Sequence, residues 1–96
     1  MRRDEALRIL AEHRAELAAL KVKQLRLFGS VARDEAGPDS DIDLLVDFSE
    51  PVGYFQFVEV RRRLALLLGR PVDLATEPSL KRQLREQILK EAIPAG

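Results

Sequence analysis

Asp41 and Asp43 stand one residue apart at the start of an apolar run that continues to Phe48. Because side chains alternate between the two faces of a β-strand, a strand here would place both carboxylates on one face. The opposite face would carry the apolar side chains, namely Ile42, Leu44, Val46 and Phe48. Carboxylates about 7 Å apart repel by on the order of 2 kcal/mol at an effective dielectric constant of about 20. A bound cation would turn this repulsion into attraction, so the pair predicts a metal site.

A third carboxylate, Asp73, lies in a short apolar stretch at residues 71–75 (PVDLA), where Val72 and Leu74 would face the core and Asp73 would face the other way. Three carboxylates on strands suit a two-metal site, in which magnesium ions lie roughly 3.5 to 4 Å apart. The chain has one histidine and no cysteine, so a metal would need oxygen ligands, which suit magnesium, calcium or manganese. Magnesium binds phosphate oxygens besides its one or two carboxylates, which favours a nucleoside triphosphate as substrate.

Gly29 and Ser30 supply the features of a phosphate-binding corner between a strand and a helix. Glycine lets the backbone approach a phosphate closely, and free backbone amides at the start of a helix attract anions. The Ser30 hydroxyl can donate a hydrogen bond, and Arg33, one turn further on, would add positive charge. Gly29, Ser30 and Arg33 are therefore candidate triphosphate ligands.

Each of these features has an ordinary structural explanation when it is taken alone. Gly-Ser is a common turn with a helix cap, and Asp-x-Asp can keep an edge strand soluble. Asp73 and Arg33 could simply be exposed residues. Their combination, with strand patterns on both sides, favours a functional site.

The elements that must position these residues follow from hydrophobic periodicity and turn signals. Ser30 suits the N-cap of the second helix, Gly69 the end of the third, and Pro94 closes the last. The pattern predicts helices at residues 3–20, 31–35, 51–69 and from Glu77 or Ser79 to 92, and strands at 24–29, 41–48 and 71–75.

This order predicts an α/β (α+β) fold with a small mixed sheet of about three strands. The short turn between the first two strands favours an antiparallel pair, and the long helix before the third allows a parallel crossover. Helices should pack mainly on one face. Their buried stripes would be Leu7, Leu10, Leu17 and Leu20; then Phe57, Val60, Leu64 and Leu67 or Leu68; then Leu80, Leu84 and Ile88.

Length and composition limit the classes of protein to which this chain can belong. The 96 residues fit one domain, residues 1–96. The 16 basic and 16 acidic residues cancel, so no overall field favours direct binding to nucleic acid. The start of the chain lacks the apolar core of a signal peptide, and no run is long enough to span a membrane. We therefore expect a cytoplasmic protein without a membrane partner.

Four stretches carry a family resemblance that covers nearly the whole chain: 28–33 (FGSVAR), 40–46 (SDIDLLV), 69–74 (GRPVDL) and 88–92 (ILKEA). Together they resemble the DNA polymerase β-type nucleotidyltransferase superfamily, and within it the minimal nucleotidyltransferases, or MNT family. The resemblance implies a palm-like fold and a transfer in which a hydroxyl attacks the α-phosphorus of a nucleotide and expels pyrophosphate.

The resemblance also implies roles for individual residues. Asp41, Asp43 and Asp73 would be catalytic and would hold magnesium, with two ions expected and manganese as a substitute. Asp73 would complete the metal site and help to activate the nucleophile. ATP would be the substrate, bound by Gly29, Ser30, Arg33 and Ser40.

Members of the MNT family commonly serve as antitoxins beside an HEPN-domain RNase toxin, and the resemblance implies transfer of AMP onto a tyrosine of that toxin. This implies a hetero-oligomer of the type VII-like toxin–antitoxin class. No acceptor-binding domain fits into 96 residues, so another chain must hold the acceptor. Tyr54, Phe55 and Phe57 are candidate contacts, or they pack the core. Two alternatives remain: an antitoxin that neutralises its partner by docking alone, and a nucleotidyltransferase acting on a small molecule or nucleic acid.

Overall fold

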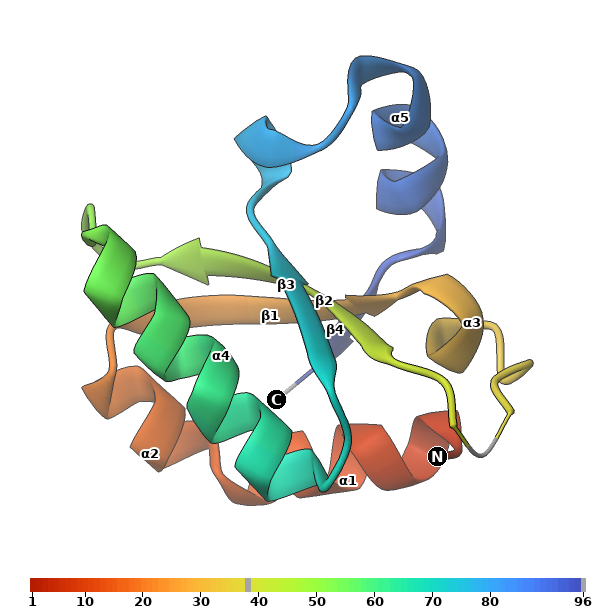
Figure 1. The fold of residues 1–96 in the computed structure, drawn as a ribbon, viewed down its shortest axis with the longest axis horizontal. Coiled ribbons are helices and arrows are strands. Elements are labelled where there is room, and N and C mark those ends of the chain that lie inside the picture. Colours follow the sequence, from red (N-terminus) through yellow and green to blue (C-terminus); the bar gives the residue numbers. More distant parts are fainter. Residues whose placement is uncertain (38, 96) are drawn as a thin grey trace.

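The computed structural model of the chain describes residues 1–37 and 39–95. Helices and strands alternate along most of the chain (Figure 1). The elements are α1 (Arg3–Glu12), α2 (Arg14–Ala19), β1 (Val22–Phe28), α3 (Gly29–Ala32), β2 (Ile42–Phe48), α4 (Tyr54–Leu68), β3 (Val72–Ala75), the 3-10 helix η1 (Glu77–Ser79), α5 (Arg82–Glu91) and β4 (Ile93–Ala95).

The strands form one mixed sheet in the order β3-β2-β1-β4. β1 pairs antiparallel with β2 and β4, and β2 pairs parallel with β3, so the predicted mixed topology is confirmed. The sheet has four strands rather than about three. β4 was not predicted because it is only three residues long and contains Pro94. Proline is tolerated in an edge strand but is not typical of one.

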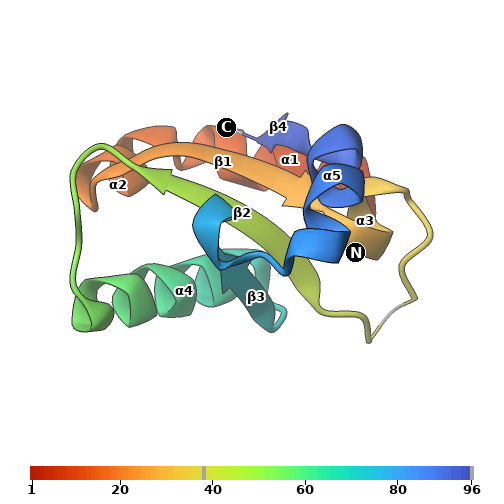
Figure 2. The same ribbon diagram turned by 90° about the horizontal axis from the view of Figure 1, so that it is seen from above.

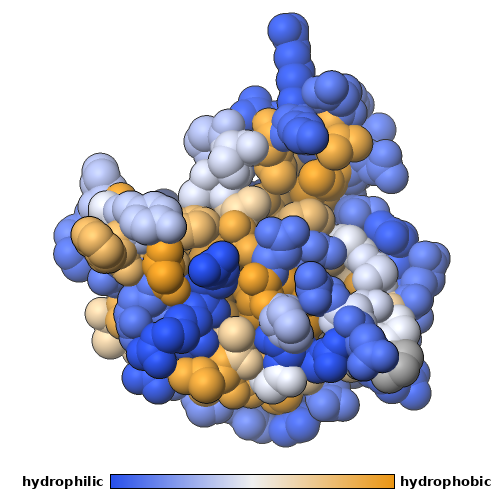
Figure 3. Space-filling view, viewed as in Figure 1, coloured by the Kyte–Doolittle hydropathy of each residue, from blue (hydrophilic) through white to orange (hydrophobic). Residues whose placement is uncertain are grey.

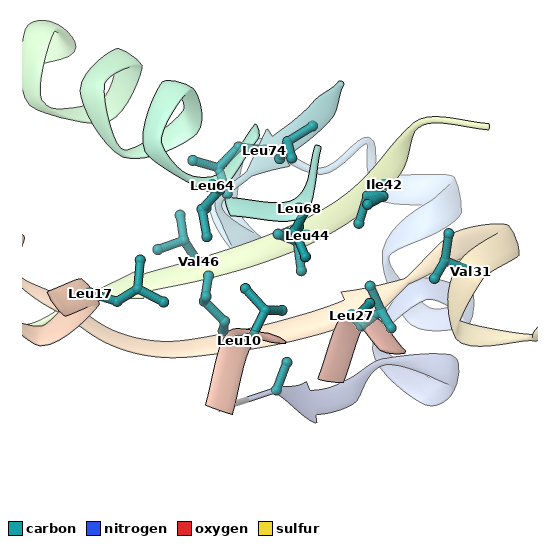
Figure 4. Packing of buried hydrophobic residues seen from close by; sticks show 14 of the residues in the cluster. Leu10, Leu17, Leu27, Val31, Ile42, Leu44, Val46, Leu64, Leu68 and Leu74 are labelled. Atoms are coloured by element: carbon teal, nitrogen blue, oxygen red, sulfur yellow. The ribbon is translucent and has the colours of Figure 1, made fainter. Parts of the chain in front are cut away.

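Helices α1, α2 and α4 cover one face of the sheet, while η1 and α5 lie on the other side (Figures 1 and 2). The main core lies between the first group of helices and the sheet, as Figure 4 shows. Its fully buried residues include Leu10, Leu27, Leu44 and Leu64, each 0% exposed. The prediction that helices pack mainly on one face is therefore confirmed, and so is the buried stripe of α4.

The helix predicted over residues 3–20 is interrupted at His13, which has φ −109° and ψ 19°. Leu10 before the break and Leu17 after it are both buried. Both short helices therefore still place a leucine in the core despite the break. No glycine or proline marks this point, so the local sequence gave no signal for it.

The last helix also differs from its prediction. The chain first makes η1 and then α5, which buries none of its residues. Leu84, expected in a buried stripe, is 47% exposed. Figure 3 shows hydrophobic side chains gathered at the base of this projecting part and hydrophilic ones over its outer end. The stripe prediction failed because α5 stands at one end of the sheet instead of lying along it.

Among the described residues, no helix combines the length and the apolar composition that crossing a membrane requires.

Candidate active site

Two of the three aspartates lie side by side on neighbouring strands. Asp43 of β2 is the register partner of Asp73 of β3 on one side and of Phe28 of β1 on the other. Their sequence neighbours Ile42, Leu44, Val72 and Leu74 are buried in the core. The alternation of side chains therefore turns Asp43 and Asp73 to the face opposite the main core. Asp41 is exposed directly before β2.

The electrostatics of this cluster centre on Asp43. Partial burial, together with the negative charges of Asp73 and Asp41, raises the pKa of the Asp43 carboxyl to about 6, while the Arg33 guanidinium opposes the rise. The predicted repulsion between the carboxylates therefore appears as a cost of ionising Asp43. At neutral pH this end of the sheet carries negative charge that the described side chains do not fully compensate.

This cost predicts that Asp43→Asn stabilises the metal-free protein at pH 7 to 8. Asp43 has a folded-state pKa of about 6 and an unfolded-state value of about 3.9. Below about pH 4 the carboxyl is protonated in both the folded and the unfolded protein, and the shift costs no stability. As the pH rises from there through about 6, the free energy of unfolding falls because the folded protein resists ionisation of Asp43. The difference of about two pKa units corresponds to at most about 3 kcal/mol, which solvent screening should reduce to about 1 kcal/mol.

Thermal unfolding in the presence of a chelator measures this effect. Asn at position 43 should raise the Tm by about 4 to 8 °C at pH 7.5 and by much less at pH 4.5. Asp47→Asn is the matched control on the same strand, because Asp47 pairs with Arg26 at 3.5 Å and should not give a gain. A destabilised Asp43→Asn protein at pH 7.5 would contradict this account of the cluster.

Gly29 packs against the carboxylate of Asp43. Its φ is +72°, and a Cβ built on it would overlap the Asp43 Oδ2 atom. Both the backbone conformation and the contact therefore require glycine. Ser30 lies inside α3, whose N-cap is Phe28, and no side chain caps this helix. The prediction of Ser30 as the N-cap was wrong, because α3 begins at Gly29, two residues before the predicted helix at residues 31–35.

Arg33 and the Gly29 amide share one carboxylate partner, Glu91 of α5. The Gly29 N–H donates to Glu91 Oε1 at 3.1 Å. Arg33 Nη1 donates to Oε1 at 3.2 Å and to Oε2 at 3.0 Å. Sequence reasoning did not identify Glu91 as a site residue, because it is 62 residues from Gly29 in the chain. Its place in the family-like stretch 88–92 was the one available signal.

Ser40 closes the turn before Asp41. Its Oγ accepts a hydrogen bond from the Gly37 N–H at 3.0 Å, and its carbonyl accepts one from Arg70 Nη2 at 3.3 Å. In the described part of the chain, the hydrogen bonds of Ser40 tie it to this turn and not to Gly29 or Arg33. Arg70, a second residue that the sequence did not single out, thus holds the segment that leads into Asp41.

Comparison with known proteins matches residues 7–95 to the nucleotidyltransferase domain family. The chain belongs to this family. Protein adenylyltransferase MntA of Thermococcus cleftensis is 40% identical to this nucleotidyltransferase over 91 residues, which are 94% of this chain and 92% of that protein. The predicted family, fold class and enzyme class are confirmed.

Solved structures agree with the family assignment. One described as a candidate minimal nucleotidyltransferase superposes with a TM-score of 0.82 and 39% identity, over 98% of this chain and 96% of the other. A chain from a complex of a tri-AMPylated Shewanella oneidensis HEPN toxin with an MNT antitoxin superposes with a TM-score of 0.58 and 22% identity, over 88% of this chain and 70% of that chain. At this identity the second likeness is one of fold.

The carboxylates of this nucleotidyltransferase fit magnesium in their chemistry. Carboxylate oxygens are hard ligands, and the unfavourable ionisation of Asp43 would be relieved by a cation. Within residues 1–37 and 39–95, however, no three carboxylate or histidine side chains converge on one point. In the described part of the chain, the structure therefore places Asp43 beside Asp73 but does not gather all three predicted metal ligands at one point.

The three aromatic residues that were candidates for contact with a partner differ in their exposure. Tyr54 and Phe55 are 76% and 87% exposed at the start of α4. Phe57 instead packs against the core, with its ring centroid 6.5 Å from that of Phe48. A groove of about 710 Å³ lies beside Tyr54 at the far end of β2, and its lining does not include Asp41, Asp43 or Asp73. Tyr54 and Phe55 therefore remain candidate contacts, while Phe57 is partly buried against the core and also lines the groove.

Proposed function

We propose that this nucleotidyltransferase transfers AMP from ATP to a hydroxyl group of a partner protein, and that the partner is an HEPN-domain toxin that this chain counteracts as an antitoxin. One observation carries the proposal. Gly29, which begins the candidate phosphate-binding segment, packs directly on Asp43, whose neighbour across the sheet is Asp73. A triphosphate at Gly29 would therefore place its phosphorus atoms beside the carboxylate cluster.

The proposed reaction assigns each residue a task. The Gly29 amide, Ser30 and Arg33 bind the triphosphate, Ser40 supports the nucleotide from the turn before Asp41, and Asp41 and Asp43 would hold magnesium. Magnesium, when bound, supplies charge neutralisation on the transferring group. Asp73 would complete the metal site and take the proton of the attacking hydroxyl. The hydroxyl oxygen forms a bond to the α-phosphorus, the bond from that phosphorus to the bridging oxygen breaks, and pyrophosphate leaves.

The acceptor is proposed to be a tyrosine of the toxin. A protein acceptor agrees with the net charge of zero, which offers no general attraction for nucleic acid. The names of the relatives, a protein adenylyltransferase and an MNT antitoxin bound to an AMPylated HEPN toxin, support the same class of acceptor. Exposed Tyr54 and Phe55 are the proposed contact with the toxin. Because ATP is an intracellular nucleotide, the proposal also keeps the expectation of a cytoplasmic protein.

Nucleotide binding tests the proposal through Ser30→Ala. Magnesium-ATP at about 100 times its Kd should stabilise the wild-type protein by about 2.7 kcal/mol. Loss of the Ser30 hydroxyl should weaken binding by about tenfold, the value of one hydrogen bond to a charged group. The Tm of the free protein should hardly change, because no side chain caps α3.

Ser49→Ala is the matched control. The Ser49 hydroxyl donates a hydrogen bond to the Lys21 carbonyl at 3.4 Å, and this contact is far from Gly29. The variant should leave nucleotide binding unchanged. A Ser30→Ala protein with a lowered Tm and unchanged nucleotide affinity would mean that Ser30 is a structural residue. No stabilisation of the wild type by magnesium-ATP would contradict the triphosphate site itself.

A further inference from the structure

A carboxylate already occupies the groups to which the proposed function assigns the triphosphate. Glu91 Oε1 accepts from the Gly29 amide at 3.1 Å, and both oxygens of Glu91 accept from Arg33, at 3.2 and 3.0 Å. The Glu91 side chain is 20% exposed, so it lies against the protein and is not a freely moving surface group. Glu91 thus presents to Gly29 and Arg33 the same kind of anionic oxygen as a phosphate.

We propose that Glu91 is an internal competitor of the triphosphate: it holds the phosphate-binding groups in the nucleotide-free protein, and nucleotide binding displaces it together with the last turn of α5. The inference rests on the proposed nucleotide site at Gly29 and Arg33. It adds a residue that no motif assigned and a structural change that accompanies binding.

Electrostatics favour displacement over shared binding. The Gly29 amide has one hydrogen, which already points at Glu91 Oε1. A phosphate oxygen at the same donor would meet the Glu91 carboxylate as a like charge within a few ångströms, where repulsion is strong in a partly buried site. Arg33 has a second carboxylate partner, Glu35, at 3.2 Å, so it would remain paired while its other donors turned to the phosphate.

The attachment of α5 permits such a movement. None of its residues is buried, and the chain is extended on both sides of it, at Lys81 and at Ala92. After the helix, Ile93 pairs with Leu27 of β1, which fixes the chain two residues beyond Glu91. The hydrogen bonds of Glu91 with Gly29 and Arg33 tie this end of α5 to α3 and the residue after it. Releasing them should loosen α5 without disturbing the sheet.

Glu91→Gln tests the proposal, because the amide keeps the shape and hydrogen-bonding oxygen of the side chain and removes its charge. Calorimetric titration with magnesium-ATP should show binding about tenfold tighter than in the wild type, since a competing closed state lowers the apparent affinity. Glu86→Gln, the same change on the exposed part of α5, should leave the affinity unchanged.

Three results separate the hypotheses. Unchanged or weaker binding by Glu91→Gln, with wild-type binding intact, would overturn the competition and make Glu91 a residue that positions Arg33. Binding by neither protein would overturn the proposed nucleotide site as well. Equal tightening in Glu86→Gln would reduce the effect to net charge and would also overturn the competition at Gly29.

Hydrogen exchange on the wild-type protein gives a readout that needs no variant. With saturating magnesium-ATP, the backbone amides of residues 86–91 should exchange faster than in the free protein, and those of α4 should not. Slower or unchanged exchange in residues 86–91 would contradict displacement of α5.

Discussion

Asp41→Asn and Asp43→Asn should each lower the rate of AMP transfer by about a thousandfold or more, about 4 kcal/mol of transition-state stabilisation, while the fold remains intact. The loss follows from removing a negatively charged metal ligand where the reaction develops charge. The fold should survive because Asp41 is exposed and Asp43 is only partly buried, on the face opposite the main core. The measurement is the initial rate of pyrophosphate release with the partner protein, together with circular dichroism.

Asp39→Asn is the matched control for this pair. Asp39 lies two residues before Asp41, its side chain is fully exposed, and it makes a 4.0 Å ion-pair contact with Arg70. The same change of charge there should leave the rate within about twofold, because exposed ion pairs contribute little. Unfolding of Asp41→Asn or Asp43→Asn would show that their position is wrong, and full activity would remove them from the catalytic site.

Gly29→Ala should lower both stability and nucleotide binding. At φ +72° an alanine is strained by about 1 to 2 kcal/mol, and its Cβ would also overlap the Asp43 carboxylate. We expect a loss of about 2 to 3 kcal/mol in the free energy of unfolding, or a Tm lower by about 10 °C or more. Displacement of Asp43 should at the same time weaken the binding of magnesium-ATP.

Gly37→Ala is the control for Gly29→Ala. A Cβ at Gly37 would have Ser40 Oγ as its nearest neighbour at 3.8 Å, which is ordinary van der Waals contact. The free energy of unfolding of this variant should lie within about 1 kcal/mol of the wild-type value. A stable Gly29→Ala protein that binds nucleotide normally would contradict the close packing of Gly29 on Asp43.

The aspartate cluster thus reduces stability where the proposed chemistry takes place. A sequence that favoured stability alone would avoid placing Asp43 beside Asp73 on paired strands. The expected gain in Tm for Asp43→Asn and the expected loss of activity in the same variant have one physical cause, which is removal of the negative charge of the Asp43 carboxylate. Such local conflicts are concentrated at functional sites.

Local patterns in the sequence were sufficient to predict much of the fold. The alternation around Asp43 and Asp73 predicted two strands and the side of the sheet on which their carboxylates lie, because strand periodicity is a local property. The stripe of α4 and the left-handed Gly69 at its end, with φ 67°, were predictable for the same reason. The family resemblance supplied the role of each residue, which periodicity cannot give.

Features that depend on contacts between distant residues could not be predicted. Glu91 reaches Gly29 only because β4 returns the chain to β1, and a three-residue strand containing Pro94 carries no recognisable pattern. The exposure of Leu84 was missed because an apolar stripe does not reveal what a helix packs against. The break at His13 was missed because no glycine or proline marks it.

The central claim, transfer of AMP to a partner protein, is tested most directly by intact mass spectrometry. The product of the neighbouring gene, the expected toxin, is incubated with this nucleotidyltransferase, ATP and magnesium. The account predicts a gain of one or more AMP units that is lost with Asp41→Asn. An unchanged mass, together with a stable complex of the two proteins, would contradict the transfer and leave neutralisation by docking alone.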